Sequence, residues 1–112
     1  MPDNRQKPNY RRTKEYRRLR DDLIANLESR GLVEAVYRDK VTEYLDLWVR
    51  RKQLQADIEA RGITIWTEKG PAENRSVTLE LQTSRQMLAI YNALGFREAP
   101  GSGRGAEPDD AL

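Results

Sequence analysis

The sequence predicts a mainly α-helical fold: a long antiparallel helical hairpin, a short β excursion, and then a third helix. Three observations lead to this prediction. Residues 33–61 contain no Gly or Pro and are rich in good helix formers, which indicates one long helix. Apolar side chains recur at helical spacing both before and after this stretch. Glycines at positions 31, 62 and 95 mark the places where the helical patterns end.

The first helix is predicted over residues 10–30. Its apolar stripe follows a 3-4-4 spacing and consists of Tyr16, Leu19, Leu23 and Leu27. Thr13 is a candidate N-cap, because a hydroxyl at this position can accept a bond from a free backbone N–H. Gly31 suits the left-handed conformation that commonly follows a helix end. The chain can then turn back on itself, so that the next helix completes a hairpin.

The long helix, residues 33–61, carries apolar residues on more than one side. A helix of this kind needs more than one packing partner. Apolar content is only 38% and charged content is 34%, which is a poor supply for the core of a small monomer. We therefore expect other copies of the chain to cover part of this helix. The residues predicted at the oligomer interface are Tyr37, Val41, Tyr44, Trp48, Leu54 and Ile58.

After Gly62, β-branched residues alternate with period two over residues 63–67, which predicts a short strand or extended segment. A turn is predicted at Lys69-Gly70-Pro71, and either Asn74 or Ser76 can cap the following helix. That helix is expected over residues 77–94, and Gly95 with Phe96 is typical of a Schellman ending. Its predicted apolar stripe consists of Val77, Leu81, Ser84, Leu88 and Tyr91, with Met87 and Leu94 beside it.

Charge divides the chain into three parts: a flexible basic arm over residues 1–9, a helical oligomerisation domain over residues 10–96, and a flexible acidic tail over residues 97–112. Residues 1–20 contain eight basic and two acidic side chains, whereas residues 98–112 have a net charge of −3. A basic segment interleaved with tyrosines can bind phosphates and stack on bases, although it can also be a solvated helix face. The predicted DNA-binding residues are Arg5, Lys7, Arg11, Arg12, Lys14, Arg17, Arg18 and Arg20.

The residue inventory argues against an enzyme. Cysteine and histidine are both absent, which removes thiol nucleophiles, serine–histidine triads and zinc sites of the usual kind. Asp39, Glu43 and Asp46 share a helical face, but such a row is more often exposed and paired, for example with Arg50, than a metal site. We expect no cofactor and no metal. No apolar run approaches the length of a membrane span, so no membrane partner is expected.

The order of elements resembles the small terminase subunit of tailed bacteriophages, in the branch with a long helical hairpin. The resemblance rests on a hairpin closing at Ile58-Glu-Ala-Arg-Gly62, a segment with Gly70-Pro71, and a last helix ending Leu94-Gly95-Phe96. It implies a viral DNA-packaging protein that forms a ring, binds double-stranded phage DNA and regulates the large subunit, which carries the ATPase and nuclease. It further implies a location in the cytoplasm of the infected bacterial host, with the acidic tail as a candidate dock for the large subunit.

Two other functions fit the same residues. One is a dimeric or tetrameric helical transcription regulator that binds nucleic acid, for which a small, even oligomer is expected. The other is a structural adaptor in which the basic arm only increases solubility. The mass of the assembly and the salt dependence of DNA binding distinguish the three possibilities.

Overall fold

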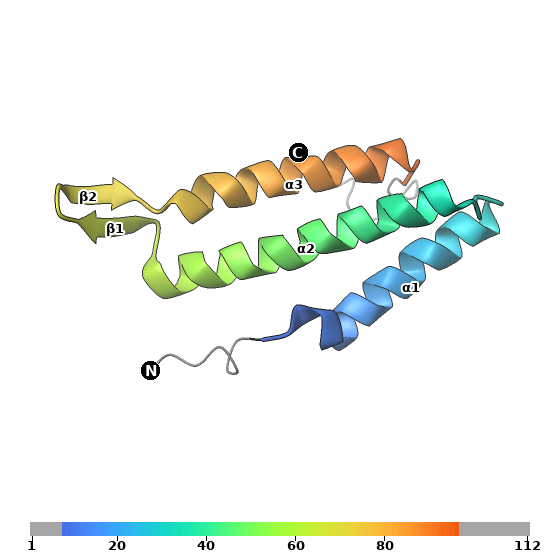
Figure 1. Cartoon of the computed structure of the whole chain (residues 1–112), viewed down its shortest axis with the longest axis horizontal. Helices are drawn as coiled ribbons and strands as arrows, with labels where there is room; N and C mark the ends of the chain where they lie inside the picture. Colours follow the sequence, from blue (N-terminus) through green and yellow to red (C-terminus); the bar gives the residue numbers. More distant parts are fainter. Residues whose placement is uncertain (1–7, 97–112) are drawn as a thin grey trace, which may run out of the picture.

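The computed structural model describes residues 8–96 (Figure 1). The predicted acidic tail and residues 1–7 of the basic arm lie outside these described residues. The described chain begins with a short 3-10 turn and continues as three helices, with a two-stranded hairpin between the second and third. The elements are η2 (Tyr10–Arg12), α1 (Lys14–Ser29), α2 (Ala35–Arg61), β1 (Thr64–Thr67), β2 (Gly70–Glu73) and α3 (Arg75–Ala93).

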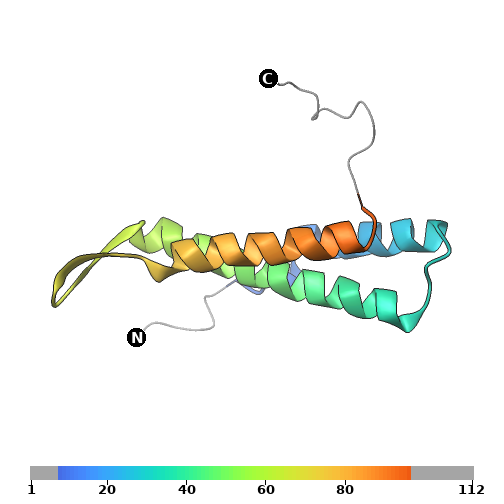
Figure 2. The same ribbon diagram turned by 90° about the horizontal axis from the view of Figure 1, so that it is seen from above.

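The long helix α2 is the element on which the other two helices pack (Figures 1 and 2). The predicted hairpin of α1 and α2 is present, but α1 diverges from α2 towards its N-terminus (Figure 1). The closer antiparallel pair is α2 with α3, which the hairpin of β1 and β2 joins at the far end of the molecule. The prediction placed α2 correctly at the centre but did not identify α3 as its main partner.

The hydrophobic core lies at the end of the molecule where α1 turns into α2. There, buried side chains from all three helices meet, and half-buried tyrosines surround them. Burial of apolar surface contributes about 25 cal/mol per Å², so this cluster is the main source of stability for the described chain. Its buried members are Leu23, Leu27, Val41, Leu45, Ile90, Leu94 and Phe96.

Two Schellman endings close the core, as the glycine positions predicted. Gly31 and Gly95 have φ angles of 77° and 81°, which lie in the left-handed region that residues with a Cβ rarely adopt. The N–H of Leu32 donates to the Leu27 carbonyl at 2.9 Å. At the end of α3, the N–H of Phe96 donates to the Tyr91 carbonyl, and the two rings stack with centroids 5.2 Å apart.

Arg30 connects the two endings. Its Nη2 donates to the Leu94 carbonyl at 2.9 Å, and its guanidinium carbon lies 5.2 Å from the centre of the Phe96 ring. A Cβ at position 95 would lie 2.8 Å from the Arg30 guanidinium, so the glycine also makes room for this contact. The ends of α1 and α3 are therefore held together by a side chain that belongs to neither apolar stripe.

The apolar stripe predicted for α3 faces the core only at its last residue, Tyr91, which packs against the core cluster. Leu81 and Leu88 of that stripe are 49% and 57% exposed. The two residues predicted beside the stripe, Met87 and Leu94, are both buried. The whole buried line consists of Ser76, Thr83, Met87, Ile90 and Leu94.

Two residues of this buried line are polar, and hydrogen bonds make their burial possible. The Thr83 hydroxyl donates to the Leu79 carbonyl, and the Ser76 hydroxyl donates to Asp57. Apolar periodicity cannot detect buried residues whose hydroxyls are satisfied in this way, so the prediction missed this part of the line.

The turn of the β hairpin also differs from the prediction. Gly70 and Pro71 belong to β2, where they pair with Thr67 and Trp66, so that Glu68 and Lys69 form the turn. Proline lacks the N–H needed inside a sheet, but both strands of a two-stranded hairpin have a free edge that tolerates it.

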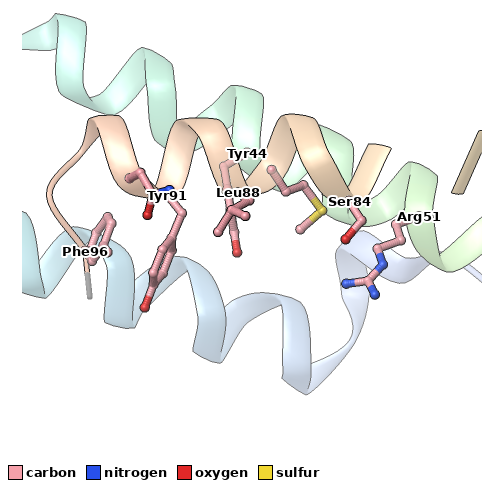
Figure 3. A pocket seen from close by; sticks show the side chains of 8 residues that line it. Tyr44, Arg51, Ser84, Leu88, Tyr91 and Phe96 are labelled. Atoms are coloured by element: carbon pink, nitrogen blue, oxygen red, sulfur yellow. The ribbon is translucent and has the colours of Figure 1, made fainter. Parts of the chain in front are cut away.

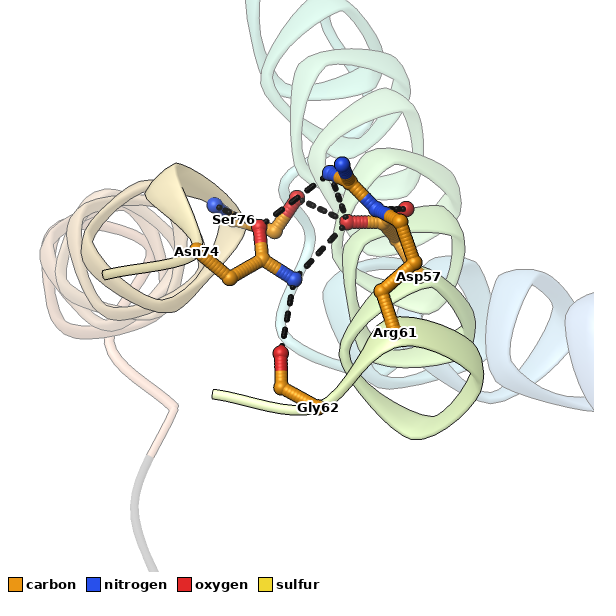
Figure 4. A network of polar contacts seen from close by, with 5 residues as sticks. All are labelled: Asp57, Arg61, Gly62, Asn74 and Ser76. Carbon is orange, nitrogen blue, oxygen red and sulfur yellow. Dashed lines mark hydrogen bonds and ion pairs between the residues drawn. The ribbon is translucent and has the colours of Figure 1, made fainter. Parts of the chain in front are cut away.

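A network of polar side chains fixes the base of this hairpin (Figure 4). Asp57 accepts two bonds from Arg61, at 2.7 and 2.8 Å, and one from the Ser76 hydroxyl at 2.6 Å. Asn74 is fully buried and donates to both Asp57 and the Gly62 carbonyl. Its side-chain oxygen accepts from the Ser76 N–H, which confirms Asn74 as the cap of α3. The network thus joins the end of α2 to the start of α3.

We expect the stability of the protein to fall in acid because two carboxylates have lowered pKa values in the fold. A hydrogen bond from Arg61, and to a smaller extent one from Ser76, lowers the pKa of Asp57. A hydrogen bond from Arg51 lowers the pKa of Glu80. The unfolded chain binds protons more readily at both sites, so the full stability is present above about pH 5 and is lost as pH falls towards the folded pKa values. Urea unfolding between pH 6 and pH 3 measures this loss.

The variant Asp57→Asn is the control for the acid effect. Its unfolding free energy should depend less steeply on pH than that of the parent chain, because one of the two carboxylates with a lowered pKa has been removed. Equal slopes for the two proteins would contradict a role of Asp57 in acid sensitivity.

Candidate nucleic-acid interface

The N-terminal end of α1 carries the candidate interface, and local capping bonds define its shape. The Asn9 side chain accepts from the Arg11 N–H at 3.1 Å, which starts η2. The Thr13 hydroxyl accepts from the Tyr16 N–H at 3.1 Å and so confirms Thr13 as the N-cap of α1. The basic residues of this region therefore lie on η2 and on the first turns of α1, and each of these two elements begins at a capping hydrogen bond.

Aromatic packing holds this basic end against α2. The rings of Tyr10 and Tyr16 lie 6.5 and 5.9 Å from that of Trp48, measured between ring centroids. The Lys52 ammonium lies 5.3 Å from the centre of the same indole. Tyr10 and Tyr16 thus serve as anchors in the structure, because both rings pack against Trp48.

Two of the predicted DNA-binding residues form ion pairs within the chain. Arg11 contacts Asp46 at 2.9 Å, and this hydrogen bond raises the pKa of Arg11. Arg20 contacts Asp21 at 3.0 Å. Asp46 therefore pairs with Arg11, a partner 35 residues away, instead of Arg50 as expected from helical spacing. Both pairs are exposed, so each contributes little to stability but reduces the local positive charge.

Four predicted residues remain as a compact basic group: Arg12, Lys14, Arg17 and Arg18. All four are exposed, and none forms an ion pair with another residue between positions 8 and 96. The Arg17 guanidinium donates to the Arg12 carbonyl at 2.9 Å, which brings these two neighbours together. We call these four residues the basic face. Arg5 and Lys7, which belong to the same prediction, lie outside the described residues.

A second basic run in α2 is mostly engaged within the chain. Arg51 forms an ion pair with Glu80 of α3 at 2.7 Å, and Gln55 donates to the same carboxylate. Lys52 lies over Trp48, as described above, and Arg50 is exposed. This run therefore helps to join α2 to α3 and offers less free charge than the basic face.

The residues predicted at the oligomer interface have different surroundings. Val41 is completely enclosed and belongs to the core of the single chain. Tyr37 and Tyr44 are half-buried against that core, and Trp48 packs on Tyr10 and Tyr16. Leu54 and Ile58 are half-buried on the second half of α2. No second copy is present to test the interface, so contact between copies at these positions stays a prediction.

A groove of about 820 Å³ lies beside α3 (Figure 3). Side chains of α2 and α3 project into it, and the Tyr44 and Tyr91 rings are 6.3 Å apart. The exposed stripe of α3 forms one wall, which explains where the apolar residues predicted for the core are found. The lining residues are Tyr44, Arg51, Ser84, Met87, Leu88, Tyr91, Asn92 and Phe96.

Sequence reasoning missed two apolar features of the surface, this groove and the exposed Trp66 of the β hairpin. Trp66 is 80% exposed on β1, so the single chain does not bury it. The signal for the groove was available in the 4-3-4-3 spacing of residues 77–91, which suits contact with another element as well as it suits a core.

Within residues 8–96, no group of three or more acidic side chains is placed to hold a metal ion. None of the helices described is both long enough and apolar enough to cross a membrane. The region of chemical interest is thus a charged surface on a helical scaffold.

Comparison with known protein families finds a match. The family model described as "Phage terminase, small subunit" matches residues 14–102, which includes α1, α2, the β hairpin and α3. No curated protein and no solved structure matches the chain.

Proposed function

We propose that this chain, which belongs to the phage terminase small-subunit family, binds double-stranded phage DNA through the basic face during genome packaging. The family supports a role in phage DNA packaging. The observation that carries the proposal is the group of four exposed cations on η2 and the first turns of α1. The other predicted DNA-binding residues are Arg5, Lys7, Arg11 and Arg20.

The chemistry of the basic face fits the phosphate backbone and not a particular base sequence. Each Lys or Arg that neutralises a phosphate releases a condensed counterion, so binding weakens as salt increases. Arginine forks pair with phosphate oxygens through two parallel hydrogen bonds. The proposal therefore predicts strong dependence on salt, with three arginines and one lysine as the contacting groups.

The same proposal includes assembly and regulation. The chain forms a ring of identical copies, acts without catalysis of its own, and regulates the large subunit in the cytoplasm of the infected bacterium. Residues 97–112 are the proposed dock for the large subunit. Support for self-assembly comes from the apolar surface that the single chain leaves exposed on α3 and on the β hairpin.

The test is a variant in which Arg12, Lys14, Arg17 and Arg18 are all replaced by glutamine. We expect its affinity for a short DNA duplex to fall roughly 10- to 30-fold at about 0.15 M salt, and the slope of log K against log salt to decrease by about three. Fluorescence anisotropy of labelled DNA at several salt concentrations measures both quantities.

A matched variant controls for the loss of net charge. Arg50, Lys69, Arg75 and Arg85 are exposed on other elements, and replacing these four by glutamine removes the same formal charge. This control should keep most of the affinity. An equal loss in the two variants would mean that DNA responds only to net charge, and the basic face would then not be the site.

A further inference from the structure

The β hairpin exposes Trp66, and the residue just before β1 exposes a second large apolar side chain, on the opposite side of the extended chain. Trp66 and Ile63 are 80% and 65% exposed, which places them among the largest uncovered apolar side chains of the described residues. An isolated two-stranded hairpin is only marginally stable in water. In Figure 1, this hairpin extends beyond the ends of α2 and α3, away from the three-helix core. Its exposed indole is therefore available to another surface.

The groove beside α3 is a surface of matching character. It is open, has a volume of about 820 Å³ and is lined mainly by aromatic and aliphatic side chains. Leu88 on its wall is 57% exposed, so apolar surface remains uncovered there as well. Arg51 is the single charged residue among those that line it. The hairpin carries Glu68 and Glu73 against Lys69, whereas the charge of Arg51 is already paired with Glu80, so the two surfaces match through their apolar side chains.

A chain does not reach its own groove with its own hairpin. Tyr44, at the floor of the groove, is separated from the end of α2 at Arg61 by about 25 Å of helix. The hairpin begins after that end and continues outward (Figure 1). The network of Asp57, Arg61 and Asn74 fixes its base, so it does not fold back. Only a second chain can bring a Trp66 to this groove.

We propose that the Trp66 hairpin of one copy docks into the α3 groove of the next copy. This inference rests on the self-assembly included in the proposed function and assigns the surfaces that make the contact. Two different surfaces can meet head-to-tail, the type of contact that generates rings when the rotation closes, or reciprocally in a two-fold dimer. The proposal takes the head-to-tail arrangement, which agrees with the ring of the proposed function. Trp66 supplies the aromatic anchor that the contact buries.

The chain's own residues 97–112 fit the groove less well. The described chain ends at Phe96, which lines the groove, but residues 97–112 are rich in Gly, Pro and Asp and contain only one large apolar side chain, Leu112. An aromatic groove gains most from an aromatic or aliphatic partner, because burial of apolar area drives association. The hairpin of a second copy is thus the better occupant.

The first test compares the mass of the full-length chain with that of Trp66→Ala over a range of concentrations, by native mass spectrometry. Loss of an interface anchor should weaken association roughly 30-fold, so that smaller species replace the parent assembly. Leu88→Glu changes the opposite surface and should have the same effect. The matched control is Val36→Ala, an exposed apolar residue of α2 outside both surfaces, which should leave the mass unchanged.

Cysteine cross-linking gives an independent readout, since the natural chain contains no cysteine. A chain with both Thr64→Cys and Ser84→Cys should form a ladder of disulfide-linked oligomers under oxidation, because Thr64 lies on the same face of β1 as Trp66. Thr64→Cys combined with Ala25→Cys, at an exposed position of α1, should not. Because the cysteine variants keep Trp66, the ladder tests the contact even if Trp66→Ala alters the hairpin itself.

The outcomes separate this inference from the proposed function. A parent chain that is monomeric at all concentrations would overturn both the ring and the head-to-tail contact. An intact assembly that ignores Trp66→Ala and Leu88→Glu, without a disulfide ladder, would overturn the contact alone and assign the groove to another occupant, such as residues 97–112 or the large subunit. Salt-dependent DNA binding is measured separately and is unaffected by either result.

Discussion

Replacing Asn74 with alanine should lower the free energy of unfolding by about 3 kcal/mol. The Asn74 side chain is fully buried and takes part in four hydrogen bonds. Alanine would remove the cap of α3 and leave the Gly62 carbonyl and the Ser76 N–H without their partner. A buried polar group without a partner costs about 1–3 kcal/mol, and loss of an N-cap costs about 1 kcal/mol.

Chemical denaturation at a fixed protein concentration measures this change, and Asn9→Ala provides the control. Asn9 also caps a helical turn, but it is exposed, and within residues 8–96 its side chain accepts one hydrogen bond, from the Arg11 N–H. Its replacement should cost less than about 1 kcal/mol, since water can take the place of the lost bond. Similar losses at the two positions would show that the network at the hairpin base adds nothing to ordinary capping.

Helix ends were the part of the fold most predictable from sequence, because local bonds determine them. Thr13, Asn74 and the two Schellman glycines act within a few residues of their own position, and each was confirmed. The face of α3 that packs inward was not predictable in the same way. It depends on the hydroxyls of Ser76 and Thr83 finding acceptors, one of which lies on a different helix.

The candidate interface shows the same limit. Charge counting identified the basic region of the sequence, but it could not show which of its residues form ion pairs within the chain. Arg11 is paired because the fold brings Asp46 to it from 35 positions away. The groove and the exposed hairpin likewise arise from tertiary packing, since most residues of the 4-3-4-3 stripe of α3 lie outside the core. Sequence patterns identify the apolar and charged residues that need a packing or ion-pair partner. The fold determines which of these residues contact such a partner within the same chain.

The second large effect is expected at Leu27, whose replacement by alanine should lower the free energy of unfolding by about 3–4 kcal/mol. Leu27 is 2% exposed and belongs to the core cluster of α1, α2 and α3. Truncation removes the transfer energy of the lost methyl groups and leaves a cavity among three helices, which the surrounding backbone closes only in part. In a domain of this size the melting temperature should fall by more than about 10 °C.

Val36→Ala is the comparison for Leu27→Ala, because Val36 is apolar but 59% exposed. It should change the unfolding free energy by less than about 1 kcal/mol under the same conditions. The two variants together test whether the core lies at the α1–α2 turn. If Leu27→Ala were as mild as Val36→Ala, the three helices would not enclose this side chain, and the stability of the fold would have to come from contacts between copies instead.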